Sequence, residues 1–464
     1  MAFSAYLDKT RGKLKEIVDI LGEEFAYASV LGTDVCATNY RVDRNTAQIS
    51  DGRGECGFVF KMTDGKNFYE YSVSNINKGV NEIAEEIISS CKKGENVYEN
   101  VDPAIPSDEP LKKSFSRESD FGEFSDAAAL EFCRKLNEEI VAADERVLNA
   151  IVMLAPYEVS KIFISKNREL DQNYGWVNGR MMVVYGGERT VMAREGWYSH
   201  KIKEVTDVLP TLKDKLLRKA RKLCSAKPIK PGVYDVITDT SITGLIAHEA
   251  FGHGVEMDQF VKNRALAKEY VGKYVASPIT NMRDGAASTL SAASYFFDDD
   301  GVLAHDTQII KDGVLIAGIS DLTSAMELGT EPTGNGRRES FKRKAYSRMT
   351  NTFFERGKDK LEDMIRSVKH GYMLFETNNG MEDPKNWQIQ CTAEYGIEII
   401  DGELTDNYVS PVVMSGSVPE LLKSITMISD GFNVAGEGMC GKGYKEWVYV
   451  SDGGANLKLK VKLA

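Results

Sequence analysis

The amino-acid sequence predicts an α+β fold whose sheets are mainly antiparallel. Strand-like segments come in runs, at about residues 35–72, 148–197 and 394–404, and they do not alternate regularly with helices. Such runs favour antiparallel pairing, because a parallel βαβ fold needs a helical crossover after each strand. Short turn sequences, among them Asp401-Gly402, separate the segments in the way that hairpins require.

The spacing of apolar residues places helices and strands in order along the chain. Amphipathic helices are predicted at about residues 6–25, 76–91, 125–143 and 211–223. Turns within the strand-rich segments are predicted at 50–54, 63–65, 178–179, 186–187, 311–313 and 401–402. Residues 94–120 are polar and contain three prolines, so we expect a linker or a long loop there.

The main domain boundary is predicted in the proline-containing segment from Lys227 to Gly232. It divides the chain into an N-terminal domain, residues 1–227, and a C-terminal domain, residues 228–464. The second domain opens with a short apolar strand at 233–238. The polar residues that follow, from Asp239 to Thr243, are suited to capping a helix.

The composition is that of an ordinary soluble globular protein. The 464 residues are 42% hydrophobic and 27% charged, and the net charge of −11 disfavours a nucleic-acid partner. No apolar run approaches the ~20 residues that cross a bilayer, and the N-terminus lacks the apolar core of a signal peptide. Seven scattered cysteines favour free thiols in a reducing compartment. We therefore expect a cytoplasmic protein with no membrane partner.

Two of the five histidines lie close together in the sequence. His248 is followed directly by Glu249, and His253 comes five residues after His248, within an apolar helical segment. On an ideal helix a spacing of five puts two side chains ~140° apart, too far to share one ion. A shared metal therefore requires a π-type widening or an unwound turn, for which Gly252 and Gly254 are expected to provide backbone freedom. The alternative is a pair of hydrogen-bonded histidines without a metal.

A catalytic zinc site usually has three protein ligands and one open position. Glu256, Asp258 and Cys440 are the candidate third ligands. Glu256 is the nearest in sequence, three residues after His253. Cys440 lies in a glycine-rich segment, residues 436–443, although a lone cysteine is more often a small buried hydrophobe. The spacing alone leaves these candidates open.

The motif from His248 to His253, together with Cys440 in the setting Gly-Met-Cys-Gly-Lys, resembles the TldD/PmbA metallopeptidases. The segments 298–301, 334–340 and 348–352 support the resemblance. It implies an N-terminal α/β region followed by a β-rich C-terminal catalytic domain. It also implies a dimer, either a homodimer or a heterodimer with a related family subunit. By matching motif, zinc ligands are expected at His248, His253 and Cys440, with Glu249 as the general base.

The predicted function is therefore that of a zinc-dependent peptidase. It would hydrolyse short or unfolded peptides with a metal-activated water and the carboxylate of Glu249. The main alternative is a non-catalytic regulatory or scaffolding subunit, such as a gyrase-modulator-like binding protein. A zinc hydrolase acting on a non-peptide amide or ester is a third possibility. We interpret the acidic residues 298–300 as a hairpin turn in preference to a second metal site.

Overall fold

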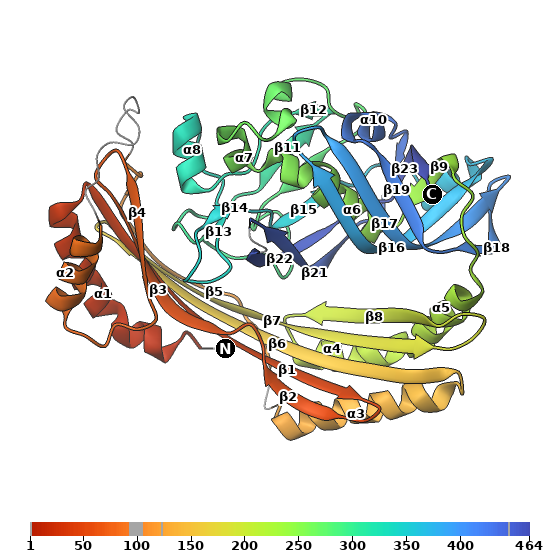
Figure 1. The fold of residues 1–464 in the computed structure, drawn as a ribbon, viewed down its shortest axis with the longest axis horizontal. Helices are drawn as coiled ribbons and strands as arrows, with labels where there is room; N and C mark the ends of the chain where they lie inside the picture. The colour runs from red at the N-terminus through yellow and green to blue at the C-terminus, as the bar shows by residue number, and fades with distance from the viewer. Residues whose placement is uncertain (1, 92–104, 122–123, 444–445) are drawn as a thin grey trace.

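The computed structural model describes residues 2–91, 105–121, 124–443 and 446–464. It has two halves, one built on a long curved sheet and the other packed against the concave side of that sheet (Figure 1). Most strand pairs are antiparallel, and the parallel pairs are β5–β7, β15–β22 and β9–β16. The predicted α+β class with mainly antiparallel sheets is confirmed.

The first half forms an eight-stranded sheet in the order β4-β3-β1-β6-β7-β5, with β2 pairing with β1 and β8 pairing with β7. Its strands are β1 (Tyr27–Asp43), β2 (Ala47–Asp51), β3 (Glu55–Thr63), β4 (Phe68–Val73), β5 (Leu111–Ser116), β6 (Val147–Ser165), β7 (Arg168–Tyr185) and β8 (Val191–Ser199). Its helices are α1 (Ala5–Glu24), α2 (Val80–Ser90), α3 (Asp126–Ala143), α4 (Ile202–Val208) and α5 (Lys213–Ser225), with a 3₁₀ turn η1 (Leu209–Leu212).

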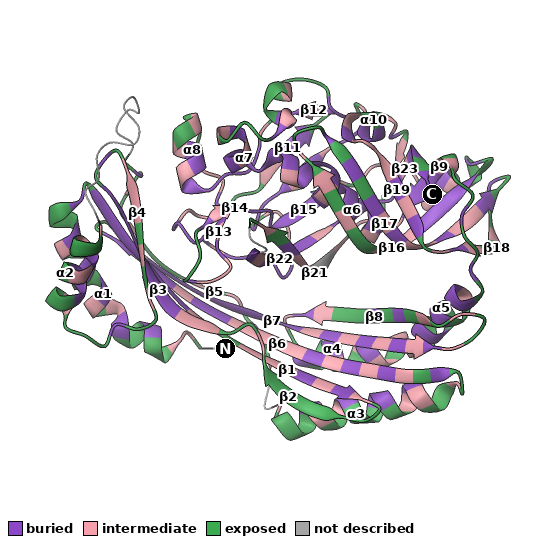
Figure 2. Ribbon diagram, viewed as in Figure 1, coloured by how far each residue is buried: buried purple, intermediate pink, exposed green. Residues whose placement is uncertain are grey.

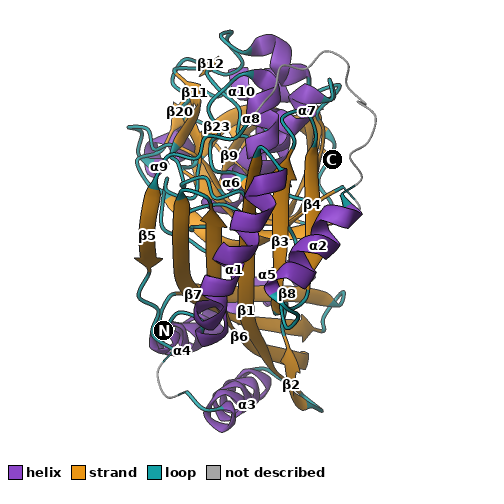
Figure 3. Ribbon diagram, turned by 90° about the vertical axis from the view of Figure 1, so that its left-hand side faces the viewer, coloured by secondary structure: helices purple, strands orange, loops and turns teal. Residues whose placement is uncertain are grey.

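Helices α1 and α2 cover one end of this sheet, on the face turned away from the second half (Figure 3). Helix α1 buries Leu14, Ile17 and Leu21, which recur at helical spacing, and Ser4 caps it by accepting the N–H of Leu7 at 3.2 Å. Strand β2 is exposed along its whole length (Figure 2).

The second half contains a six-stranded sheet, β12-β11-β10-β15-β22-β21, a seven-stranded sheet around β16-β9-β23-β19-β17-β18, and the pair β13-β14. Its strands are β9 (Gly232–Thr238), β10 (Met282–Asp284), β11 (Thr307–Lys311), β12 (Val314–Leu315), β13 (Gly336–Arg337), β14 (Tyr346–Ser347), β15 (Asn351–Phe354), β16 (His370–Asp383), β17 (Gln388–Ile400), β18 (Glu403–Val409), β19 (Val412–Ser417), β20 (Met427–Ile428), β21 (Asn433–Lys442), β22 (Glu446–Gly454) and β23 (Leu457–Leu463). Its helices are α6 (Thr240–Leu245), η2 (Ile246–Gly252), η3 (His253–Val255), α7 (Met257–Val261), η4 (Leu266–Tyr270), α8 (Leu322–Leu328), α9 (Leu361–Arg366) and α10 (Val418–Lys423).

Three predicted features differ from the structure. Asn178 and Gly179 lie inside β7 and form no turn; Gly179 leaves room for α4, since an added Cβ would lie 2.4 Å from Val205. Residues 50–54 make no hairpin, because β2 and β3 both pair with β1. Part of the expected loop at 94–120 lies outside the described residues, and another part forms β5, an edge strand with little apolar alternation.

The two halves meet through buried charges. Asp298, Asp299 and Asp300 form a turn closed by Gly301 at φ +76°, as the sequence predicts, but all three are buried. Lys61 of β3 pairs with Asp300 at 2.7 Å, and Lys161 of β6 pairs with Asp299. The turn therefore joins the second half to the first. The division of the chain at residues 227 and 228 stays a prediction. In the part of the chain that is described, no helix is long and apolar enough to span a bilayer.

Replacing Lys61 with methionine should destabilise the protein, because it leaves the Asp300 carboxylate buried without its partner. The expected loss in the free energy of unfolding is about 3–5 kcal/mol, measured by chemical denaturation. Lys203→Met is the matched control, since Lys203 pairs with Asp207 at the surface with side chains 81% and 61% exposed. Its loss should stay below about 1 kcal/mol. Equal losses in the two variants would mean that the Lys61–Asp300 pair is not buried.

Candidate metal centre

One continuous stretch of the second half, running from β9 through α6 and η2 to η3, carries the two histidines. Strand β9 ends at Thr238, and Asp239 caps α6 by accepting the N–H of Ile242 at 2.7 Å. The helix continues without a break into a π-helical turn, η2, that contains His248. The sequence prediction that this polar segment caps the histidine-bearing helix is confirmed.

The π-helical turn solves the spacing problem of the two histidines. The N–H of His253 donates to the carbonyl of His248, a hydrogen bond across five residues where an α-helix spans four. The two imidazole rings consequently lie on one side, with their centres 5.0 Å apart and their planes at 89°. The expected π-type widening is confirmed.

The glycines around His253 serve a different purpose from the one predicted. Gly252 has an ordinary helical φ of −59°, and Gly254 does not have a positive φ. What they provide is space. A Cβ on Gly252 would lie 2.0 Å from the sulfur of Met349, and one on Gly254 would lie 2.8 Å from the carboxylate of Glu382. The prediction that they add backbone freedom is therefore wrong.

Cys440 reaches the histidines from β21, nearly two hundred residues later in the chain. Its Sγ lies 3.5 Å from Nε2 of His253. One donor atom from each of His248, His253 and Cys440 lies within 4.8 Å of the other two. His248 and Cys440 are each 4% exposed, while the His253 side chain is 19% exposed. The three predicted donors therefore converge at a buried point that opens on the His253 side.

The three donors shift one another's pKa strongly. Burial alone would lower the pKa of His248, but the adjacent Cys440 raises it to about 9. Burial alone would raise the pKa of Cys440, but the two imidazoles bring it well below its ordinary value. The thiolate form is thus favoured in this buried place. A positive charge among the three groups is favourable, and a divalent cation would provide one.

Glu256 and Asp258, the other two candidate ligands, face away from this point. Glu256 accepts a hydrogen bond from Nδ1 of His253 at 3.1 Å, which leaves Nε2 of that ring directed at Cys440. Lys442 pairs with Glu256 at 3.0 Å and with Asp258 at 2.6 Å. Glu256 therefore lies behind His253, where such a group orients a histidine ligand, and Asp258 is held by Lys442.

A fully buried arginine fixes the strand that carries the thiol. Arg348 donates to the carbonyl of Cys440 at 2.7 Å and to the carbonyl of Glu446 at 3.1 Å, so it ties β21 to β22. Its Nε also lies 4.0 Å from Glu256. Arg348 thus links the backbone of β21, which carries Cys440, to Glu256, which accepts a hydrogen bond from His253.

Three carboxyl groups lie around the donors. Glu249 is half-buried in η2, and β16 packs on it so closely that a Cβ on Gly380 would lie 2.5 Å from its Cγ. Burial raises the pKa of Glu382 to about 8 and that of Asp452 to about 6. Glu382 accepts the N–H of Gly254 at 3.0 Å. The sequence pointed only to Glu249, because Glu382 and Asp452 sit in ordinary strand sequence far from the motif.

These groups open onto a groove of about 1860 Å³ between the two halves. One wall contains the donors, Glu249 and strand β21. The other wall is formed by β7 and β8, including Arg180, Arg194, Trp197 and Tyr198. Strand β21 is the last strand of the six-stranded sheet, and β8 pairs only with β7 among the described strands. Two sheet edges therefore border the groove.

The chain is similar to known proteins in both sequence and fold. Residues 231–457 match the family model of the PmbA/TldA metallopeptidase C-terminal domain. A metalloprotease of Methanothermobacter thermautotrophicus is 31% identical over 242 residues, 52% of each chain. A zinc metalloprotease TldD homolog of Saccharolobus solfataricus is 29% identical over 271 residues, 58% of this chain and 59% of that protein. The matched region thus spans about half the length of these curated relatives.

Two solved structures resemble the whole described fold. TldE from Thermococcus kodakarensis superposes with a TM-score of 0.75 at 19% identity, over 97% of this chain and 100% of that chain. A proposed modulator of a DNA gyrase from Thermotoga maritima gives 0.78 at 18% identity, over 99% and 100%. At such identities the likeness shows the fold alone.

The π-helical histidine pair and the converging thiolate form a candidate three-donor metal centre in the β-rich half of the chain. The family match covers the half that carries all of these groups. Residues 231–457, which carry the donors, match the C-terminal domain of the PmbA/TldA metallopeptidase family.

Replacing Gly252 with alanine should disturb the π-helical turn, because the added methyl overlaps the sulfur of Met349. We expect a loss of about 1–3 kcal/mol in the free energy of unfolding, the usual effect of overpacking. Gly12→Ala in α1 is the matched control, since a Cβ there meets no atom within 4 Å. That change should be neutral or stabilising by about 0.5–1 kcal/mol. If both variants unfold alike, Gly252 is not in contact with Met349.

Proposed function

We propose that the chain is a zinc-dependent peptidase whose metal is held by His248, His253 and Cys440. The observation that carries the proposal is the convergence of these three donors to within 4.8 Å of one another. Two imidazoles and a thiolate are ligand types that zinc prefers, and three protein ligands leave one position open. The donor set also fits because Glu256 holds Nδ1 of His253 and leaves Nε2 as the available nitrogen.

The reaction we propose is hydrolysis of a peptide bond. Zinc would supply Lewis acidity toward a water molecule and toward the carbonyl group that is attacked. Glu249 takes a proton from the attacking water and passes it to the leaving amine. Its position on η2, one residue after His248, puts the carboxylate on the groove, and the backbone of β16 at Gly380 limits its movement. The buried donors keep bulk water away from one side of the site.

The substrates we propose are short or unfolded peptides. An extended chain entering the groove meets the edges of β21 and β8, and an edge strand is the part of a sheet that accepts strand addition. Such binding reads the backbone more than the side chains. A compact folded protein has no free extended segment to offer, so it should be a poor substrate. We further propose that the enzyme acts in the cytoplasm as a homodimer or as a heterodimer with a related family subunit.

The relatives support the peptidase proposal by their names, since the two described above are a metalloprotease and a zinc metalloprotease. The alternative is a regulatory or scaffolding subunit, which the gyrase-modulator description of the Thermotoga maritima protein suggests for that protein. A binding subunit has no need for a carboxylate beside three convergent metal donors. Glu249 therefore favours catalysis.

Replacing Glu249 with glutamine should leave metal binding intact and abolish most peptide cleavage. Glutamine keeps the shape of the side chain but cannot accept the proton, so the rate should fall by about 10²- to 10⁴-fold. Turnover of an unstructured peptide by metal-loaded protein measures this. Glu362→Gln, an exposed glutamate on α9, is the control and should keep the full rate. Cleavage by the Glu249 variant at the unaltered rate would refute the general-base role.

Replacing Cys440 with serine should weaken zinc binding by at least about tenfold, because a direct ligand matters at least as much as the groups behind it. Glu256→Gln should weaken it less, since this residue only orients His253. Cys133→Ser, which alters a buried thiol in the other half, should leave zinc affinity unchanged. Competition with a chelating dye at fixed pH gives all three affinities. If the Glu256 variant loses zinc and the Cys440 variant keeps it, Glu256 is the third ligand.

A further inference from the structure

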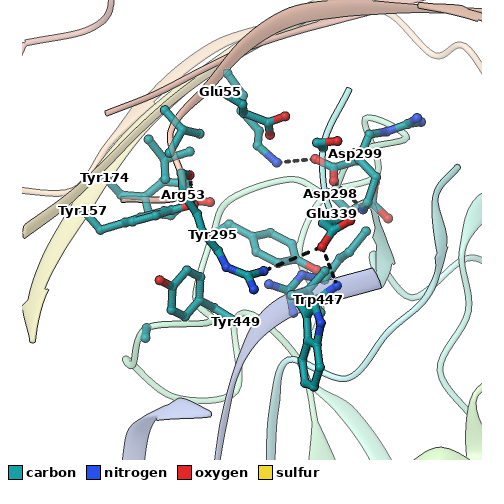
Figure 4. A pocket seen from close by; sticks show the side chains of 18 of the residues that line it. Arg53, Glu55, Tyr157, Tyr174, Tyr295, Asp298, Asp299, Glu339, Trp447 and Tyr449 are labelled. Atoms are coloured by element: carbon teal, nitrogen blue, oxygen red, sulfur yellow. Dashed lines mark hydrogen bonds and ion pairs between the residues drawn. The ribbon is translucent and has the colours of Figure 1, made fainter. Parts of the chain in front are cut away.

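A second cavity lies between the long sheet and the β21–β22 hairpin, and Trp447 lines both this cavity and the groove (Figure 4). Its volume is about 340 Å³, at the lower end of the range for small-molecule sites. Side chains from β1, β3, β6 and β7 line one side. Side chains from β13 and from the β21–β22 hairpin line the other. Both halves of the chain are therefore needed to form it.

Aromatic rings form one wall of this cavity. Tyr157 and Trp176 of the long sheet lie with their ring centres 4.4 Å apart. Tyr449 of β22 packs edge-on against both, at 5.0 Å and 5.3 Å. The rings hold one another in place across the boundary between the halves, so the wall is rigid. A planar, apolar group is the ligand part that such a wall favours.

Four basic side chains line the cavity, and three of them have a carboxylate partner. Arg53 pairs with Glu339 at 3.7 Å, Lys161 pairs with Asp299, and Arg338 pairs with Glu70 at 3.1 Å. Arg337 is the fourth.

Among the described residues Arg337 forms no ion pair. Its Nη1 donates to the carbonyl of Met349 at 2.7 Å, and its guanidinium lies 5.6 Å from the centre of the Tyr295 ring. The half-buried guanidinium is thus positioned at the cavity with donors still available for a carboxylate.

The acidic residues at the cavity do not compete for Arg337. Asp298 accepts the backbone N–H groups of Gly336 at 2.8 Å and of Val302 at 3.0 Å. Glu55 accepts the N–H of Phe341 at 2.9 Å. Both carboxyl groups are held by backbone N–H groups and form no ion pair with Arg337 among the described residues, so the guanidinium keeps donors for an incoming carboxylate.

The cavity adjoins the proposed active site through the β21–β22 hairpin. Side chains on a strand alternate between its two faces, so Cys440 points to the histidines while Met439 points the other way. Met439 and Trp447 line both the groove and the cavity. The two spaces are consequently separated by little more than one strand, a distance that one or a few residues of an extended peptide span at about 3.3–3.6 Å each.

We propose that this cavity binds the C-terminal aromatic residue of a peptide, with the ring against Tyr157, Trp176 and Tyr449 and the free carboxylate on Arg337. The part of this proposal that concerns substrates rests on the proposed peptidase function. It adds a selection rule to that function. Peptides that end in a free aromatic residue are preferred, and they are cleaved at a fixed short distance from that end.

The binding part can be tested without catalysis, on the Glu249→Gln protein. The probes are N-acetyl-L-phenylalanine, its C-terminal amide and N-acetyl-L-alanine. Binding is followed by tryptophan fluorescence, since Trp176 and Trp447 line the cavity. We expect the phenylalanine acid to bind about 10- to 100-fold more tightly than its amide, the usual effect of a charged hydrogen-bond pair. The alanine acid should bind more weakly than the phenylalanine acid. Equal binding of acid and amide overturns the proposal, and this comparison needs no change at the cavity.

Variants of Arg337 test whether this arginine binds the carboxylate of the probe. Arg337→Gln should remove the preference for the acid, and Arg337→Lys should keep part of it, because charge is retained while the two-pronged geometry is lost. Arg356→Gln is the matched control, since Arg356 is an exposed arginine that also lies over a ring, that of Phe432, at 5.3 Å. An unchanged acid preference in Arg337→Gln would place the carboxylate elsewhere and overturn the assignment.

The substrate part uses the active protein and a set of unstructured peptides that differ only at the C-terminus, analysed by mass spectrometry. A free C-terminal phenylalanine should lower KM about 10-fold or more relative to the amide, and the cut should stay at one distance from the end when the peptide is lengthened at its N-terminus. Cleavage that ignores the C-terminus overturns this rule while leaving the peptidase intact. Acid-selective probe binding without any cleavage would instead refute the peptidase proposal and leave the cavity as a carboxylate site.

Discussion

The hydrogen bond from His253 to the carbonyl of His248 is the interaction on which the rest of the site depends. An α-helix turns by about 100° per residue, so a regular helix would direct these two imidazoles to different sides. One wider turn brings them together. That turn needs space, and Gly252 provides it beside the sulfur of Met349. The position of His253 then decides where Glu256 and Cys440 have to be.

The strand that supplies the thiol is held by the same set of charges that orients the histidine. Glu256 contacts His253 and Lys442, and Lys442 belongs to β21, two residues after Cys440. Arg348 binds the carbonyls of Cys440 and of a residue on β22. A displacement of the hairpin would therefore leave buried charges without partners, which is unfavourable by several kcal/mol. Cys440 therefore stays beside His248 and His253, although nearly two hundred residues separate it from them in the chain.

Local sequence was informative where structure follows from local geometry. The spacing of His248 and His253 required a π-type turn, and the cap at Asp239 and the hairpin at Asp401-Gly402 are present as predicted. Other features depend on contacts that no local pattern records. Asn178-Gly179 has the composition of a turn, yet it lies within β7 because α4 needs a residue without a side chain beside it. Glu382 and Asp452 are ordinary strand residues until the fold places them, half-buried, near the histidines.

The position of the two halves relative to each other determines the shape of both the groove and the second cavity. Near one end of the boundary, Lys61 and Lys161 of the long sheet engage Asp300 and Asp299 (Figure 1). Near the other end, Lys219 of α5 pairs with Glu376 of β16 at 2.6 Å. Buried ion pairs of this kind contribute little net stability, but each is strongly unfavourable when one partner moves away. These ion pairs therefore hold the two halves at a fixed separation. A ligand that reaches across the β21–β22 hairpin meets groove and cavity walls that are already in place.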